Sequence, residues 1–169
     1  MAKPITPFDA RAMNRAADEW RANCGPAALA AVTMTPIQDV RQHMAGFLRK
    51  GYTNPTLMRS ALQSMGFQVK PVTDWPALGL VRVQWHGPWM NDNVPIRARY
   101  RHTHWIGSCV DEDQTWIFDV NAVTATGGWL AVDLWTRSLA PWIIKYCVPN
   151  GDGQWSLTHL WEVSDGRKS

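Results

Sequence analysis

The apolar residues of the first third of the chain recur at helical spacing. An alanine-rich run over residues 27–34 follows Pro26, which suits the first turn of a helix because the missing N–H needs no partner there. A second helix is expected from Pro36, and a third from Pro55 to a stop at Gly66. We therefore predict that this third of the chain is helical.

After the third helix the apolar pattern changes to period two. Residues 67–72 and 80–86 form short alternating runs that are typical of strands. Two further runs, at 102–110 and 115–120, flank the polar segment "DEDQ", and this arrangement predicts an antiparallel hairpin.

The C-terminal part combines a helical stretch with one more strand. Residues 132–146 carry an apolar face at helical spacing, which Pro141 is expected to kink or interrupt. A last strand is predicted over 155–163. Helices followed by antiparallel strands indicate an α+β fold in which the N-terminal helices pack on one side of the sheet. We expect an N-terminal arm over 1–17 and a single domain over 18–169.

Composition narrows the classes of protein that this chain can represent. The 169 residues are 46% hydrophobic, and a net charge of +3 without blocks of like charge argues against nucleic-acid binding. No segment has the length and hydrophobicity of a signal peptide or a membrane span, so we expect neither a membrane partner nor a location outside the cytoplasm. Three cysteines at unrelated spacings predict free thiols, with Cys109 and Cys147 as buried fillers.

Cys24 stands where the first predicted helix begins. Unpaired N–H groups and the positive end of the helix dipole stabilise a thiolate there, and the same N–H groups can hold the oxyanion of an acyl intermediate. This position is expected of a nucleophile. The alternative is a small buried residue without chemistry, which is common for free cysteine.

The predicted hairpin supplies partners for such a thiolate. His104 lies on its first strand and Asp119 at the end of its second, so antiparallel pairing brings the two side by side as a general acid–base and its orienting group. His102 shares a strand face with His104, so periodicity alone does not choose between them. Asn121 is the substitute for Asp119.

Three segments in order, "NCGPAALAAV", then "HW" before small and apolar residues, then "IFDVNAV", resemble the papain-like cysteine peptidases. The likeness is closest to the bacteriocin-leader peptidases fused to ABC transporters and to small phage or prophage peptidases of that type. It implies a papain-like fold, with Cys24 as the nucleophile, His104 as the acid and base, and Asp119 as the orienting residue.

One position departs from the pattern of that family. A glutamine normally stands six residues before the cysteine and donates to the oxyanion, whereas this chain has Asp18, which cannot donate when ionised. We consider Asn23, Gln38 and the backbone N–H groups around Gly25 as replacements. Trp85, Trp89 and Trp129 flank the predicted site along the chain and could wall a substrate groove, whereas core packing is the expected role of most of the eleven tryptophans.

These features predict a cysteine peptidase that hydrolyses a peptide or isopeptide bond in a protein or peptide substrate, in the cytoplasm of a bacterial host or associated with a virion. No cofactor is required, and the pair His102 and His104 lacks the further ligands of a zinc site. Arg97, Arg99 and Arg101 share one face if their segment is extended and could guide an acidic substrate. The alternative is an inactive papain-like module with a binding or structural role in a phage particle or its assembly.

Overall fold

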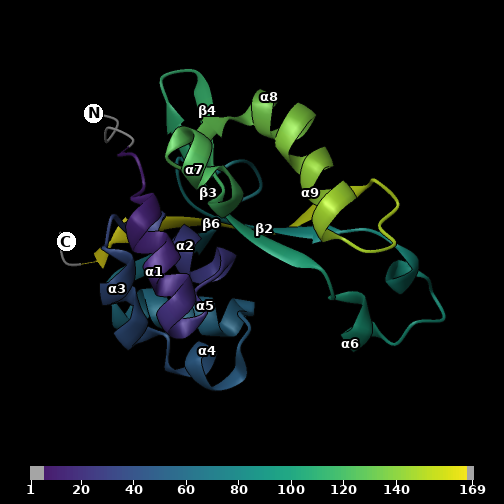
Figure 1. The fold of residues 1–169 in the computed structure, drawn as a ribbon, viewed down its shortest axis with the longest axis horizontal. Coiled ribbons are helices and arrows are strands. Elements are labelled where there is room, and N and C mark those ends of the chain that lie inside the picture. Colours follow the sequence, from purple (N-terminus) through teal and green to yellow (C-terminus); the bar gives the residue numbers. More distant parts are fainter. Residues whose placement is uncertain (1–5, 167–169) are drawn as a thin grey trace.

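One six-stranded antiparallel sheet organises the part of the chain that the computed structural model describes, residues 6–166 (Figure 1). Its strands lie in the order β1-β6-β2-β3-β4-β5. The long final strand β6 thus inserts between β1 and β2, which ties the end of the chain into the sheet. The strands are β1 (Phe67–Pro71), β2 (Leu78–Trp85), β3 (Thr103–Asp111), β4 (Gln114–Phe118), β5 (Trp129–Ala131) and β6 (Trp155–Asp165).

Helices cover both faces of this sheet. Figure 1 shows α1 to α5 gathered on one side, whereas α8 and α9 lie on the other and α6 sits on an extended arm. The α-helices are α1 (Ala10–Trp20), α2 (Cys24–Thr33), α3 (Ile37–Val40), α4 (Ala45–Lys50), α5 (Pro55–Ser64), α6 (Ile96–Arg99), α7 (Val123–Thr126), α8 (Val132–Leu134) and α9 (Ala140–Cys147). Single 3-10 turns are found at Arg41–His43, Pro88–Met90 and Val120–Ala122, and a π-helical turn at Trp135–Leu139. Within residues 6–166, no helix is long and apolar enough to cross a membrane.

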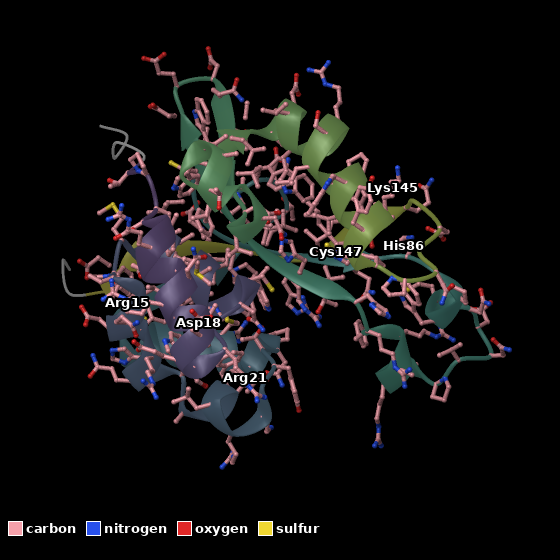
Figure 2. All side chains as sticks on the ribbon, in the orientation of Figure 1. Arg15, Asp18, Arg21, His86, Lys145 and Cys147 are labelled. Atoms are coloured by element: carbon pink, nitrogen blue, oxygen red, sulfur yellow. The ribbon has the colours of Figure 1, made fainter. Side chains whose placement is uncertain are left out.

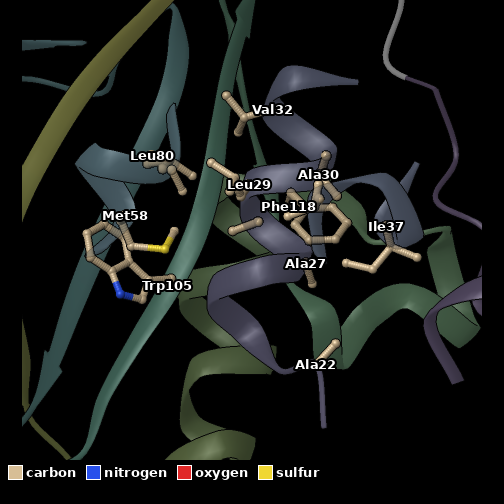
Figure 3. Packing of buried hydrophobic residues seen from close by; sticks show 14 of the residues in the cluster. Ala22, Ala27, Leu29, Ala30, Val32, Ile37, Met58, Leu80, Trp105 and Phe118 are labelled. Atoms are coloured by element: carbon tan, nitrogen blue, oxygen red, sulfur yellow. The ribbon is translucent and has the colours of Figure 1, made fainter. Parts of the chain in front are cut away.

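Helix α2 is the element that carries the first core. Its side chains are almost all buried, because its alanines allow close approach to β3 while Leu29 and Val32 fill the space between them (Figure 3). Phe118 and Trp105 close this layer from the sheet side. The packing fixes where α2 begins relative to β3.

A second core lies on the opposite face. Val81 and Val83 of β2 point there, together with Ile106 of β3, and they pack against Trp135 and the start of α9. The N-terminal helices pack on one face as predicted, and a second helical layer, which the sequence analysis did not anticipate, covers the other face. The residues 132–147 form the second helical layer.

Most predicted elements are present with boundaries shifted by one or two residues, and the hairpin turns between Asp111 and Gln114 as expected. The predicted C-terminal helix is irregular just before Pro141: α8 passes into the π-helical turn Trp135–Leu139, and α9 begins at Ala140, directly before the proline. The run containing Arg97, Arg99 and Arg101 is not extended, since its start forms α6. Helix α1 crosses the predicted boundary at residue 17, and that division of the chain stays a prediction.

Candidate active site

Cys24 is the first residue of α2. The side chain of Asn23 caps the helix and accepts a hydrogen bond from the backbone N–H of Gly25 at 3.3 Å. The sulfur is half-buried and accepts a hydrogen bond from the backbone N–H of Trp105 on β3. The nucleophile candidate is thus held between the start of a helix and the neighbouring strand.

The hairpin brings His104 and Asp119 together as the sequence predicts. His104 is the second residue of β3, Asp119 directly follows β4, and His104 Nε2 lies 2.9 Å from Asp119 Oδ2. Both side chains are buried. Because Nε2 faces the carboxylate, the other ring nitrogen, Nδ1, remains for the hydrogen bond between His104 and Cys24.

Two other residues complete the surroundings of the Asp119 carboxylate. Its Oδ2 also accepts a hydrogen bond from Trp135 Nε1 at 2.9 Å, and its Oδ1 accepts from the backbone N–H of Asn121 at 2.9 Å and from Asn121 Nδ2 at 3.0 Å. Both oxygens are therefore satisfied twice. Asn121, considered as a substitute for Asp119, instead holds it in place.

His104 and each of its two partners favour one another's charged state, whereas the Asp119 carboxylate by itself opposes the Cys24 thiolate. Burial raises the pKa of the Cys24 thiol. The charge of His104 and its hydrogen bond to the sulfur lower that pKa and outweigh the burial, so the net pKa lies below its ordinary value. Burial lowers the pKa of His104, yet Asp119 and Cys24 raise it well above its usual range. Burial raises the pKa of Asp119, and the His104 imidazolium and the Trp135 N–H outweigh that effect and leave it lowered. The geometry favours a thiolate beside an imidazolium.

Trp85 covers one face of the His104 imidazole. Its ring stacks on His104 with centroids 6.0 Å apart and on Trp135 with centroids 6.3 Å apart. Trp85 is itself buried. Such an apolar cover lowers the local dielectric and strengthens the interaction between the imidazole and the carboxylate.

A cleft of about 310 Å³ opens over Cys24 and His104. It lies between the start of α2, the start of β3, the segment after β4 and the end of α9. Its lining comprises Asn23, Cys24, Trp85, His102, Thr103, His104, Val120, Asn121, Ile143, Cys147 and Val148. Cys147 is exposed here, and not the buried filler that we predicted.

Several predicted site residues do not line this cleft. Gln38 is engaged elsewhere, because its Oε1 accepts from Trp20 Nε1 at 3.2 Å and its Nε2 donates to Glu19 at 3.3 Å. The prediction that Gln38 could serve the oxyanion was therefore wrong. Asp18 is exposed on α1, and Figure 2 shows it well apart from Cys147. The position of the family's glutamine thus contributes nothing to the cleft.

The tryptophans expected to wall the groove divide among three places. Trp85 lines the cleft. Trp89 does not line the cleft itself. Its ring centroid lies 4.2 Å from that of the lining residue His102, and its Nε1 donates to the carbonyl of Trp85. Trp129 packs against Phe118 and lines a separate apolar cavity, so its predicted role at the groove was wrong.

The structure shows which of the two histidines belongs to the site, a choice that strand alternation alone could not make. His102 precedes β3 and has a φ of 53°, in the left-handed region, so alternation along the strand does not extend to it. Its ring is exposed and lies against Trp89, whereas His104 is buried against Asp119. Within the described range 6–166, no group of three His, Cys, Asp or Glu side chains is arranged to hold a metal ion.

Sequence reasoning missed the contribution of the C-terminal helical layer. In the sequence Trp135 is one more apolar position on the face of a predicted helix. The spacing of apolar residues does not show that its N–H donates to Asp119. Thr103, Ile143 and Val148 likewise line the cleft without any chemical signal in the sequence. Only the need of a buried carboxylate for additional donors could have suggested a partner such as Trp135.

Comparisons of this chain with protein-family models, with curated proteins and with solved structures found no match.

Gly25 is required by the close contact between α2 and the loop before α5. A Cβ at this position would lie 2.6 Å from both Cγ2 and Oγ1 of Thr53. Gly25→Ala is expected to lower the free energy of unfolding by about 1 to 3 kcal/mol, measured by urea denaturation. The double variant with Thr53→Ala should recover much of this loss. An unchanged stability in the single variant would contradict the close contact.

Proposed function

We propose that the chain is a cysteine hydrolase of the papain-like type that cleaves an amide bond in a peptide or protein. One observation carries the proposal: Cys24 at the start of α2 is hydrogen-bonded to His104, whose Nε2 is bonded to the buried carboxylate of Asp119. This is the order of nucleophile, general acid–base and orienting group that activates a thiol for acyl transfer. The open cleft over the sulfur provides access for a peptide.

The chemistry follows from the protonation states. The Cys24 thiolate adds to the carbonyl carbon of the substrate, and the carbonyl oxygen becomes an oxyanion. His104 gives its proton to the departing amine as the C–N bond breaks, which leaves an acyl group on Cys24 Sγ. His104 then takes a proton from water, the resulting hydroxide attacks the thioester, and the carboxylic acid and the thiolate are released.

Donors for the oxyanion are available without a glutamine. The backbone N–H of Cys24 opens α2 and has no acceptor within the helix. The Oδ1 of Asn23 accepts from Gly25, which leaves its Nδ2 to donate at the edge of the same cleft. Two such donors in this position are the usual means of stabilising a tetrahedral intermediate.

The pH dependence of thiol alkylation tests the proposal. Iodoacetamide is expected to modify Cys24 well below pH 7, and at least about tenfold faster than the exposed Cys147, because only the thiolate reacts. Mass spectrometry of the digested protein measures both rates in one sample, and a screen of internally quenched peptides measures turnover. Equal and slow labelling of Cys24 and Cys147 would contradict the proposal, and Cys24→Ser serves as the inactive control.

A second candidate function is a binding module without turnover, such as a component of a phage particle or its assembly. Asp18 in place of the family's glutamine favours it, since no side chain from that position reaches the cleft. A reactive Cys24 with no cleavage of any peptide in the screen is the outcome that distinguishes this candidate from a hydrolase.

A further inference from the structure

Arg82 is a buried cation on β2. Arg82 is only 6% exposed, and its Nε has no hydrogen-bond partner. Its Nη2 donates to Thr103 Oγ1 at 3.3 Å, and the guanidinium carbon lies 5.8 Å from the ring centroid of Tyr100. Among residues 6–166, no carboxylate forms an ion pair with it. A contact with an aromatic ring replaces only part of the hydration that such a charge loses on burial.

The neighbouring side chains add hydrogen-bond donors, and Arg59 adds a second positive charge; burial and the two arginines lower the pKa of His159, which favours its neutral form. His159 of β6 and Trp105 of β3 lie opposite Arg82 in register, so all three share one face of the sheet. Trp105 is buried, and its indole Nε1 also lacks a partner. Arg59 reaches this face from α5, where its guanidinium lies over the ring of Trp161 at 5.2 Å. We call Arg59, Arg82 and His159 the arginine cluster.

Thr103 connects the arginine cluster to the candidate active site. It lines the cleft that contains Cys24, and its hydroxyl is the group that accepts from Arg82. Thr103 is also the residue directly before His104. Arg82 itself does not line the cleft, but its guanidinium lies one hydrogen bond behind a lining residue, next to His104 in the chain.

The arginines of the arm are in a different situation. Arg99, which the sequence offered as a guide for acidic substrates, is occupied by Asp92 at 3.7 Å and by the carbonyls of Asp92 and Val94. Arg82, which touches the cleft-lining Thr103, has no carboxylate or carbonyl partner of this kind among residues 6–166.

We propose that the arginine cluster binds a carboxylate of the substrate close to the scissile bond, so that the enzyme selects acidic peptides. This inference rests on the proposed function of Cys24. A carboxylate is the matching group because it accepts in the plane in which a guanidinium donates and removes the unpaired charge. The carboxylate comes either from an acidic side chain or from the C-terminus of the peptide.

Two alkylating reagents of nearly equal size test the charge preference. Iodoacetate carries a carboxylate and iodoacetamide does not, so the ratio of their rates at Cys24 reports the local preference for an anion. Any change in the thiolate fraction affects both reagents equally and cancels in the ratio. Arg82→Gln is expected to lower the ratio by at least about threefold, the size expected for a charge pair near the surface.

Arg15→Gln is the matched control, because it removes one exposed arginine of α1 that does not line the cleft, and it is expected to leave the ratio within about twofold of the wild type (Figure 2). An unchanged ratio in Arg82→Gln, or an equal fall in both variants, overturns the inference. If Arg82→Gln does not fold, Arg59→Gln on the exposed side of α5 replaces it, with a smaller fall in the same direction. Slow reaction of Cys24 with iodoacetamide itself contradicts the proposed function, and the inference falls with it.

Paired internally quenched peptides identify the source of the carboxylate. Peptides that carry glutamate or glutamine at each position flanking the scissile bond test the side chain, and peptides that end in a free acid or an amide test the C-terminus. A kcat/KM at least about threefold higher for one acidic member, lost in Arg82→Gln, supports that source. Equal kcat/KM values in every pair overturn the inference.

Discussion

His104→Gln is expected to slow the alkylation of Cys24 at about pH 6.5 by roughly 10- to 100-fold. Burial alone raises the pKa of the Cys24 thiol, and the charge of His104 is what brings it below its ordinary value. Glutamine keeps a polar side chain beside Asp119 but carries no charge, so the thiol returns to its protonated state. Cleavage of a peptide substrate should fall further, by at least about 10³-fold, because the proton donor for the leaving amine is also lost.

His43→Gln provides the matched control for this experiment. His43 hydrogen-bonds Ser64 at 2.7 Å in the helical layer and does not line the cleft. Its replacement should leave the alkylation rate of Cys24 within about twofold of the wild type. Equal labelling of the wild type and His104→Gln over the range from pH 5 to 8 would show that the thiol and the imidazole are not coupled.

Asp119→Ala is expected to lower the free energy of unfolding by about 3 to 5 kcal/mol. The substitution leaves the N–H groups of Trp135 and Asn121 without their acceptor and removes the counter-charge of the buried His104. Urea denaturation measures the loss. Asp133→Ala, which removes a carboxylate from an exposed ion pair with Arg137, is the control and should cost less than about 1 kcal/mol.

The loss in Asp119→Ala should depend on pH in a defined direction. The pKa of Asp119 is lowered in the folded state, so its contribution is present above its unfolded pKa of about 4 and is lost as the pH falls through the folded value. The pKa of His104 is raised, so its contribution is present below its unfolded pKa of about 6.5 and is lost as the pH rises through the folded value. The difference between wild type and variant is therefore largest between about pH 4 and 6.5, and a difference that grows steadily toward alkaline pH would contradict this coupling.

The local parts of the site could be predicted from the sequence because they depend on short-range rules. Proline after Gly25 fixes where α2 begins, and a four-residue polar segment between two alternating runs fixes the hairpin register closely enough to place His104 near Asp119. These features need no knowledge of the remaining fold. The α+β class follows from the same periodicities.

The remaining parts depend on contacts between distant segments, which periodicity does not encode. The N–H of Trp135 reaches Asp119 only because the C-terminal helical layer crosses the sheet at that point. The burial of Arg82 could not be predicted from the alternation of β2, because an arginine in an alternating strand is expected to face solvent. Gln38 failed as a candidate for the same reason: whether an amide faces the nucleophile is decided by the packing of α3 against α1.

From the short sequence separation we expect the hairpin that joins His104 to Asp119 to form before Cys24 joins the site. Those two residues are fifteen positions apart, so their contact can form early and locally, whereas Cys24 arrives from the N-terminal end only when α2 docks on β3. Before that docking the sulfur has no imidazolium beside it and remains an ordinary, weakly acidic thiol. A chain in which α2 has not docked on β3 is therefore expected to react slowly with alkylating reagents, because the docked His104 is what lowers the pKa of Cys24.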